Sequence, residues 1–514
     1  MLYTDNQFDL NRLEVLFIIP ESRTYEYLGL SYLSSSLQKN GISSKILQLE
    51  SIEELEYLIK NSKNLSLVGI TWLYSYSENS VIKIAKYIKS IRFEIAIVVG
   101  GHPPSLNYAN ILKENPEINY ILRGEADFGI FKLINLLKKK EIAENISGLS
   151  YINENGEVIC NKLYRIDNLD LLTFPDRSQL DKIISLKKNQ ILISILGSRG
   201  CYASCNFCSM VSFYACNETN IKWIGRSPEN ILDEIKIIIS KFQINTFWFI
   251  DDEFIGPPKK GRERVLSFAE LIIKNNIVLE YGFDARANGI AAFSDDDLAL
   301  LKRSGLKMIS IGIESGSQNM LDRMNKRIDV KLNWQAIHKL IRNKIDYRYG
   351  FIMYDPETNF DDINQNLKFL LFAKPYRICN TGAFRLLNSL FPHTGTKFTK
   401  TIKGKTEIMR NSLLNNFPEY SEDELGYTFI NPNISRYRNI LYQFARSFIE
   451  PKMIQRTNET NNIWYGVNDL PQNIAIMDAF LECHIWLAEN IQYSESNLYY
   501  LTEMQCIFTQ YYKP

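Results

Sequence analysis

The feature that most constrains the fold of this 514-residue chain is an alternation of short apolar runs with helical patterns. Between Val15 and Leu137, apolar runs of three to five residues are separated by segments whose apolar residues recur at helical spacing. Strands that alternate with helices in this way form parallel sheets covered by helices on both faces. The chain is therefore predicted to be an α/β protein with an N-terminal doubly wound sheet, whose strands are Val15–Ile19, Leu67–Ile70, Ile95–Val99 and Tyr120–Leu122.

The same alternation resumes at Ile191 with longer units. Helical patterns such as Pro228–Phe242 and Arg264–Ile277 separate further apolar runs, which favours a second α/β region. The six strands expected there are Ile191–Leu196, Thr246–Ile250, Leu279–Phe283, Met308–Ile313, Tyr347–Met353 and Thr381–Leu387.

Open parallel sheets bind ligands beyond the carboxyl ends of their strands. In the N-terminal half these ends carry Pro20–Gly29, Thr71–Ser77, Gly100–Pro104 and Arg123–Glu125. Glycine at such a place lets the backbone approach a ligand closely, although a Gly-Gly pair after a strand is also common in a plain turn. From the residues alone, both interpretations stay open.

Three cysteines in a C-x3-C-x2-C pattern, Cys201, Cys205 and Cys208, follow the first strand of the second region. Eight randomly placed cysteines would produce this spacing roughly 0.001 times per chain, so it indicates a site. Three thiolates are one short of the four ligands that saturate zinc or a simple iron–sulfur cluster. A structural zinc site would need a nearby fourth ligand, and the nearest, Cys216, lacks a C-x-x-C partner, while disulfides would need an oxidising compartment. We therefore predict an iron–sulfur cluster with one open iron.

This loop resembles the signature of the radical S-adenosylmethionine (radical SAM) enzymes. The resemblance implies a [4Fe–4S] cluster held by Cys201, Cys205 and Cys208, with S-adenosylmethionine (SAM) chelated to the fourth iron and Phe207 near its adenine. It also implies reductive cleavage of SAM to a 5′-deoxyadenosyl radical, supplied with an electron by an external donor such as flavodoxin or ferredoxin. The six expected strands would then form a partial (β/α)6 barrel with its chemistry at their carboxyl ends.

Acidic residues follow several of these strands, with Asp251 and Asp252 after the second and Glu314 after the fourth. Such carboxylates can bind the amino group and ribose hydroxyls of SAM, or they can cap the helices that follow. Gly312–Ser317 and Gly350–Pro356 resemble the fourth- and fifth-strand motifs of cobalamin-dependent radical SAM proteins, where the Glu lies near the ribose. The predicted SAM contacts are Phe207, Asp251, Asp252, Glu314 and Ser315.

The N-terminal half resembles the Rossmann-like cobalamin-binding domain that precedes many radical SAM cores. The resemblance rests on Tyr27–Leu33, Gly69–Thr71, Gly100–Pro103 and Gly124-Glu125, in that order. The D-x-H-x-x-G motif of other cobalamin proteins does not occur, so the likeness implies cobalamin without a protein histidine ligand.

The lower face of the corrin would be covered by the loop Thr71–Ser77, and His102 would be a contact rather than an axial ligand. The cobalamin contacts implied by the resemblance are Leu28, Gly29, Thr71, Tyr74, Ser75, Gly100, Gly101, His102, Pro103, Gly124 and Glu125.

These patterns predict a cobalamin-binding domain over residues 1–147, a linker over 148–188, a radical SAM partial barrel over 189–395 and a mainly helical C-terminal domain over 396–514. Leu169–Arg177 is similar to the family's L-P-x-P-D-R linker, with Thr173 in place of its first proline. In the C-terminal domain, His484 lies on an apolar stripe at helical spacing, which favours a core residue over a ligand.

The composition limits the classes of partner that the protein is expected to bind. Lys and Arg number 59 and Asp and Glu 58, so no excess of positive charge attracts nucleic acid. No apolar run reaches the ~18 residues of a membrane span and no secretory signal is apparent, so a soluble, cytoplasmic protein is expected.

The resemblance implies C-methylation of an unactivated carbon in a natural-product or peptide precursor, through methylcobalamin and a 5′-deoxyadenosyl radical. Catalytic side chains are not identified, and the route needs no general base at the carbon, in keeping with only 4 histidines. Two alternatives stay open: a non-methylating radical SAM enzyme for cyclisation, ring contraction, epimerisation or sulfur insertion, and a cobalamin-binding sensor or carrier.

Overall fold

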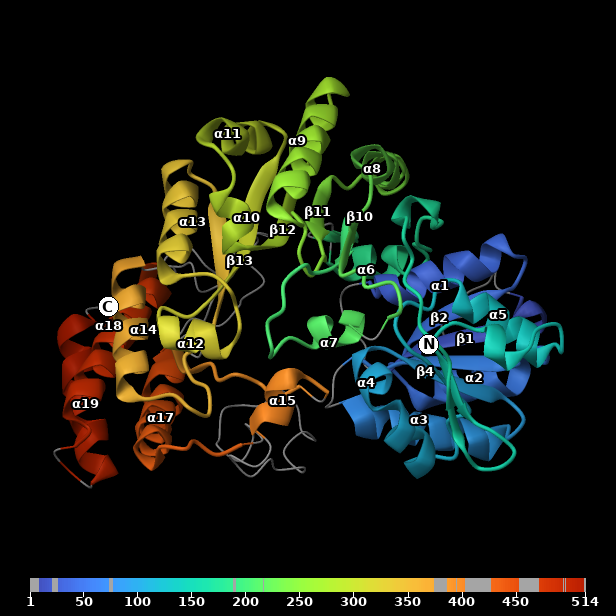
Figure 1. Ribbon diagram of the computed structural model, residues 1–514, viewed down its shortest axis with the longest axis horizontal. Helices are drawn as coiled ribbons and strands as arrows, with labels where there is room; N and C mark the ends of the chain where they lie inside the picture. Colours follow the sequence, from blue (N-terminus) through green and yellow to red (C-terminus); the bar gives the residue numbers. More distant parts are fainter. Residues whose placement is uncertain are drawn as a thin grey trace. The chain divides into compact units, whose positions relative to one another are not determined.

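The computed structural model describes residues 9–20, 26–73, 77–187, 191–215, 217–373, 386–393, 395–402, 427–452, 471–492, 494 and 496–512 (Figure 1). The chain divides into two compact units. The first comprises Met1–Asn189 and Ser209–Arg226, and the second Gln190–Cys208 and Ser227–Pro514. Ser209–Arg226 thus groups with the N-terminal unit, whereas the sequence pattern assigned it to the barrel; the four-domain division itself stays a prediction.

A seven-stranded sheet in the order β2-β1-β3-β4-β5-β6-β7 forms the centre of the first unit. The first five strands run parallel, and the last two add an antiparallel hairpin beside β5. The parallel order 2-1-3-4-5 is a doubly wound order whose switch point lies between β1 and β3, where such sheets bind ligands. The strands are β1 (Val15–Ile19), β2 (Ser44–Gln48), β3 (Leu67–Thr71), β4 (Ala96–Gly100), β5 (Tyr120–Leu122), β6 (Leu149–Ile152) and β7 (Val158–Cys160).

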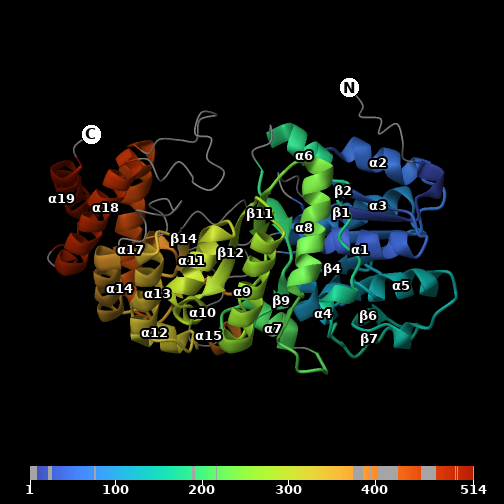
Figure 2. The same cartoon turned by 90° about the horizontal axis from the view of Figure 1, so that it is seen from above.

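Five helices cover the two faces of this sheet, because successive strand residues point to opposite sides. Leu16 and Ile18 pack with apolar residues of α2, α3 and α4, whereas Phe17 and Ile19 pack with those of α1 and α5. Figure 2 shows α2 and α3 on one side of the strands and α1 and α5 on the other. The helices are α1 (Leu28–Lys39), α2 (Ile52–Asn61), α3 (Glu78–Ile91), α4 (His102–Glu114) and α5 (Gly129–Leu137), and the unit also contains α6 (Leu180–Lys187), α7 (Ser209–Ala215) and the short strand β10 (Trp223–Gly225).

The turn between β4 and α4 requires glycine at position 101. Gly101 has a φ of 121°, and a Cβ atom there would lie 2.1 Å from the carbonyl oxygen of Trp72. Ser105 connects this turn with the next strand end, because its hydroxyl donates to the Gly101 carbonyl (2.7 Å) and accepts from the Gly124 amide (3.0 Å). The ends of β3, β4 and β5 are therefore fixed relative to one another.

We expect Gly101→Ala to lower the free energy of unfolding of the first unit by about 3 kcal/mol or more, because it adds overlap with a backbone oxygen to backbone strain. Gly41→Ala is the matched control, since Gly41 also has positive φ (74°) but open space around its Cβ position. Gly41→Ala should lower the free energy of unfolding by only about 1 kcal/mol. Urea unfolding followed by circular dichroism measures both, and equal costs would show that crowding at Trp72 is unimportant.

The second unit contains a five-stranded parallel sheet in the order β14-β13-β12-β11-β8. Figures 1 and 2 show α8, α9 and α13 in a row along one side of these strands. Most of the expected sixth strand, Thr381–Leu387, lies outside the described residues, although Tyr354 forms an isolated parallel bridge with Ser389. The elements are β8 (Ile193–Ile195), β9 (Ser198–Gly200), α8 (Pro228–Phe242), β11 (Thr246–Phe249), α9 (Pro258–Lys274), β12 (Glu280–Arg286), α10 (Ala287–Ala291), α11 (Asp295–Arg303), β13 (Leu306–Glu314), α12 (Gln318–Arg323), α13 (Val330–Arg342), β14 (Asp346–Phe351) and α14 (Phe360–Ala373).

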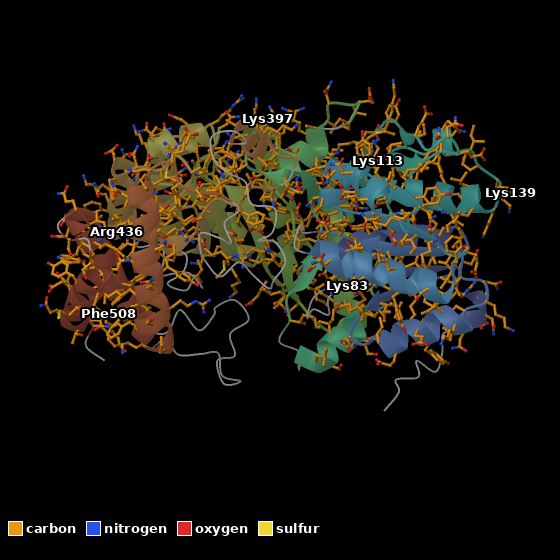
Figure 3. All side chains as sticks on the ribbon, turned by 90° about the horizontal axis from the view of Figure 1, so that it is seen from below. Lys83, Lys113, Lys139, Lys397, Arg436 and Phe508 are labelled. Atoms are coloured by element: carbon orange, nitrogen blue, oxygen red, sulfur yellow. The ribbon has the colours of Figure 1, made fainter. Side chains whose placement is uncertain are left out.

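The C-terminal part of the second unit is helical. Its helices are α15 (Lys397–Ile402), α17 (Pro432–Phe444), which continues as a π-helical turn over Ala445–Ile449, α18 (Pro471–Asn490) and α19 (Asn497–Tyr511). Figure 3 shows Phe508 of α19 and Arg436 of α17 on these neighbouring helices. None of the helices in the described part of the chain has the length and apolar character that crossing a bilayer requires.

His484 of α18 is a core residue of this helical part. Its side chain is fully buried between two phenols, with Nδ1 2.6 Å from the Tyr437 hydroxyl and Nε2 3.3 Å from the Tyr354 hydroxyl. Burial lowers the pKa of His484 to about 3, so the ring is neutral. Tyr354 directly follows the fifth-strand motif, and the histidine therefore joins α17 and α18 to the end of the sheet.

Candidate functional site

The cysteine loop lies after β8 and β9 in the second unit. Cys205 is buried, Cys201 and Cys208 are half-buried, and none of the three forms a disulfide. A second segment, Arg323–Arg327, which we call the strap, holds the loop. The Asn206 amide donates to the Met324 carbonyl (3.0 Å), and Asn325 Nδ2 donates to the Ser204 carbonyl (2.6 Å).

Arg323 attaches the strap to the end of the fifth strand. Its guanidinium pairs with Asp355 (2.9 Å) and with Asp362 (2.8 Å), and both carboxylates are buried. A guanidinium that pairs with two carboxylates is fixed in its orientation as well as in its position. The fifth-strand motif Gly350–Pro356 thus supports the cysteine loop through Asp355.

Asp251 and Asp252, two predicted SAM contacts, bind the backbone that leads into the cysteines. Asp251 accepts hydrogen bonds from the Gly197 amide (2.9 Å) and the Ser198 hydroxyl, and Asp252 accepts one from the Gly200 amide (3.1 Å). Burial raises the pKa of Asp251 to about 7, against the opposing effect of these hydrogen bonds. Neither residue caps the following helix, whose N-cap is Pro257, and contact with SAM stays a prediction.

Glu314 sits at the end of β13 in an unusual conformation. It is a non-glycine residue with a φ of 65°, and its Oε1 lies 2.7 Å from Nζ of the buried Lys326. Cβ atoms at Gly312 and Gly350 would approach the Glu314 carboxylate to 2.8 and 3.2 Å. The glycines of the two strand motifs thus make room for this carboxylate, which remains half-buried.

The two other predicted SAM contacts differ in exposure. Ser315 is fully buried, and its hydroxyl donates to Asn366 Oδ1 of α14 (2.7 Å). Phe207 is half-buried within the cysteine loop. The structure therefore brings Phe207 and Glu314 to half-exposed positions, whereas Ser315 lies inside.

Arg286 is a site residue that the sequence pattern did not single out. It ends β12, is 7% exposed, and its Nη1 lies 3.2 Å from the Cys205 sulfur. Its Nη2 donates to the Lys326 carbonyl (2.5 Å), and its amide donates to the buried Glu253 carboxylate (2.6 Å). The sequence places Arg286 among the polar residues at the end of the third strand, but no role was predicted for it.

In the first unit the predicted cobalamin contacts gather at the carboxyl ends of β1, β3, β4 and β5. Gly29 is exposed with open space at its Cβ position, Thr71 and Gly100 are half-buried, and Leu28 is buried. Tyr74 and Ser75 lie outside the described residues. The indole nitrogen of Trp72, next to Thr71, is buried without a hydrogen-bond partner in the described part of the chain.

His102, Pro103, Gly124 and Glu125 belong to the same edge, where two of them also contact other parts of the unit. The His102 ring stands edge-on to Phe213 of α7, with ring centroids 4.8 Å apart. Glu125 binds Arg165 (3.2 Å) and the Ile166 amide (3.1 Å).

Arg165, another residue that the sequence pattern missed, lies 4.0 Å above the ring of Tyr214. These contacts are the physical reason why Ser209–Arg226 groups with the first unit.

Both sites fit the groups that the resemblance implies. Three cysteine thiols in one loop are soft donors of the kind an iron–sulfur cluster uses, and the buried Arg286 guanidinium lies beside one of them. The described residues contain no group of three His, Cys, Asp and Glu side chains already arranged around a metal ion. In the first unit, the open face at Gly29 suits a flat ligand.

Comparison with known proteins agrees with this arrangement. The family pattern described as the B12 binding domain matches residues 23–129, and that of the radical SAM superfamily matches residues 195–370. The chain is 28% identical over 284 residues to the anaerobic magnesium-protoporphyrin IX monomethyl ester cyclase of Rubrivivax gelatinosus, covering 54% of this chain and 48% of that one.

It is also 26% identical to an uncharacterized methyltransferase of Pyrococcus horikoshii, covering 66% of this chain and 72% of that protein. Among solved structures, the cobalamin-dependent SAM radical enzyme OxsB, with aqua-cobalamin and SAM bound, has a similar fold. Its TM-score is 0.74 at 19% identity, and the match covers 97% of this chain and 75% of OxsB. The chain thus spans about half the length of the cyclase, and the likeness to OxsB concerns the fold.

A doubly wound B12-binding unit together with a radical SAM sheet that carries a three-cysteine loop defines a radical SAM enzyme with a corrinoid domain. The chain belongs to the cobalamin-dependent radical SAM enzymes, and its cofactors are a [4Fe–4S] cluster, SAM and cobalamin. The α/β fold expected from the sequence, with its helical C-terminal part, is confirmed.

Proposed function

We propose that this enzyme is a C-methyltransferase that acts on an unactivated carbon of a natural-product or peptide precursor. The observation that carries the proposal is the combination, in one chain, of the C-x3-C-x2-C loop with a 2-1-3-4-5 sheet whose glycine-rich edge is open at Gly29. When bound, SAM and cobalamin supply both the methyl group and the radical that this reaction needs.

The side chains of the second unit would bind and orient SAM. Cys201, Cys205 and Cys208 hold the cluster, and Phe207 lies beside the adenine. Glu314 accepts hydrogen bonds from the ribose hydroxyls, in an orientation fixed by the Lys326 ammonium at 2.7 Å. Asp251 and Asp252 keep the loop backbone in place through Gly197 and Gly200.

The side chains of the first unit would bind the corrinoid. Gly29, Gly100 and Gly101 let the backbone approach a flat ring closely, and Thr71 borders the same edge. His102 acts as a contact whose ring is held by Phe213. A reduced flavodoxin or ferredoxin is the proposed electron donor, and a small molecule or peptide the proposed substrate.

Incubation of the anaerobically reconstituted protein with SAM and a reductant, without substrate, tests the proposal. Corrinoid-loaded protein should release S-adenosylhomocysteine at about one equivalent per corrinoid, and corrinoid-free protein should release none. Formation of 5′-deoxyadenosine without S-adenosylhomocysteine in either preparation would contradict methyl transfer.

That contrary outcome would favour a non-methylating reaction such as cyclisation. The specific observation behind this second candidate is the 28% identity to a protein named as a cyclase. Chromatography of the reaction with mass detection distinguishes the two nucleoside products directly.

A further inference from the structure

We propose that Arg286 is a positioning residue that raises the reduction potential of the cluster by donating a hydrogen bond to the sulfur of Cys205. The inference rests on the proposed function, because it takes Cys205 as a cluster ligand. It adds to that function a specific control of how readily the cluster accepts an electron.

Three contacts hold Arg286 in place beside Cys205. Nη1 lies 3.2 Å from the Cys205 sulfur, while Nη2 donates to the Lys326 carbonyl (2.5 Å). The Arg286 amide is bound by Glu253 (2.6 Å), which fixes the backbone from which the side chain extends. The side chain therefore has little freedom to turn away when the thiolate joins a cluster.

The surroundings strengthen this contact. Arg286 is 7% exposed, and its Nε is buried without a hydrogen-bond partner in the described part of the chain. Its charge lies over the ring face of Tyr202, 5.9 Å from the centroid. Water that would screen a surface charge is largely excluded here, so the guanidinium acts on nearby charge at a low effective dielectric constant.

Two acidic side chains lie near Arg286. Glu253 binds the backbone amides of Arg286 and Gly256 (3.3 Å), and Glu314 pairs with the Lys326 ammonium. The guanidinium itself donates hydrogen bonds to the Cys205 sulfur and the Lys326 carbonyl. The guanidinium thus presents its positive charge to the Cys205 sulfur.

The expected effect follows from the electron balance. Reduction transfers one electron from a low-potential donor, reduced flavodoxin or ferredoxin, to the oxidised cluster, which gains one negative charge while the donor is oxidised. A buried cation and an N–H···S hydrogen bond stabilise the more negative state, so both raise the potential. Without Arg286 the reduced state is less favourable.

Redox titration of the reconstituted protein, monitored by electron paramagnetic resonance without SAM, tests the inference. Arg286→Gln should lower the ratio of reduced to oxidised cluster at fixed potential about tenfold, equivalent to a midpoint about 59 mV more negative for one electron. Arg286→Lys keeps the charge and should shift the midpoint less. The matched control is Arg262→Gln, which removes an arginine that pairs with Asp297 in the same unit (2.7 Å) and should leave the midpoint unchanged.

A second measurement uses the wild-type protein and does not depend on the folding of a variant. With 15N-arginine incorporated, pulsed electron paramagnetic resonance of the reduced cluster should show a 15N coupling transmitted through the hydrogen bond to Cys205. The Arg262→Gln variant should show the same coupling. A wild-type midpoint in iron-replete Arg286→Gln, or no 15N coupling, would overturn the inference. If the wild-type protein took up no [4Fe–4S] cluster at all, the proposed function would fail before Arg286 is tested.

Discussion

Replacement of Cys208 by alanine is expected to abolish the [4Fe–4S] cluster and SAM cleavage together. A cluster of this type needs three protein thiolates when its fourth iron binds SAM, and two leave a second iron without a protein ligand. Changes that only disturb the surroundings of metal ligands already lower metal affinity or activity by about 10- to 100-fold. Loss of a ligand should therefore reduce SAM cleavage by more than about 100-fold.

Cys160→Ala is the matched control, because Cys160 is an exposed free cysteine on β7 in the first unit. It should keep the iron content and the yield of 5′-deoxyadenosine of the wild-type protein. Iron and sulfide assays with product chromatography measure both variants. Full cluster content in Cys208→Ala, or equal losses in both variants, would contradict the assignment of this loop.

Acidification is expected to destabilise the second unit through His484. The neutral ring is buried between Tyr437 and Tyr354, and burial lowers its pKa from 6.5 to about 3. The unfolded chain takes up a proton near pH 6.5 that the folded chain does not accept until about pH 3. Stability is therefore complete above about pH 6.5 and is lost as the pH falls, by at most about 5 kcal/mol once the pH is below 3.

His484→Asn isolates this effect, because its amide can still reach the Tyr437 hydroxyl but does not titrate. Between pH 6.5 and 4.5 the wild-type protein should lose about 2 kcal/mol more than this variant, although the variant is less stable at neutral pH. His338→Asn, which changes an exposed histidine of α13, should follow the wild-type curve. Urea unfolding at several pH values measures the difference, and parallel curves for wild type and His484→Asn would refute it.

Apolar periodicity was enough to predict β1, β3, β4 and β5, because strands buried on both faces are continuous apolar runs. It missed β2, an edge strand of Ser44–Gln48 with only two buried positions, whose polar residues hide the pattern. The segment predicted as a linker also contains β6 and β7, which the structure adds to the sheet beside β5. Which strands pair with one another cannot be predicted from the residues of such short segments alone.

The candidate site divides in the same way. The cysteine loop and the glycines at strand ends are local patterns, and the sequence identified both. Arg286, Lys326 and Arg165 act through partners that lie 81, 12 and 40 residues away in the chain, at Cys205, Glu314 and Glu125. No spacing rule connects them to the site, and only the folded chain brings them there.

The sequence by itself determined the class of the protein: where the strands alternate with helices, which cysteines share one loop and which turns need glycine. These are properties of neighbouring residues, set by side-chain periodicity and backbone freedom. The tertiary structure alone decided which charges face the thiols, that Ser209–Arg226 packs with the first unit, and that His484 is buried between two phenols. Burial and charge depend on residues far apart in the chain, so they become definite only when the strands and helices pack.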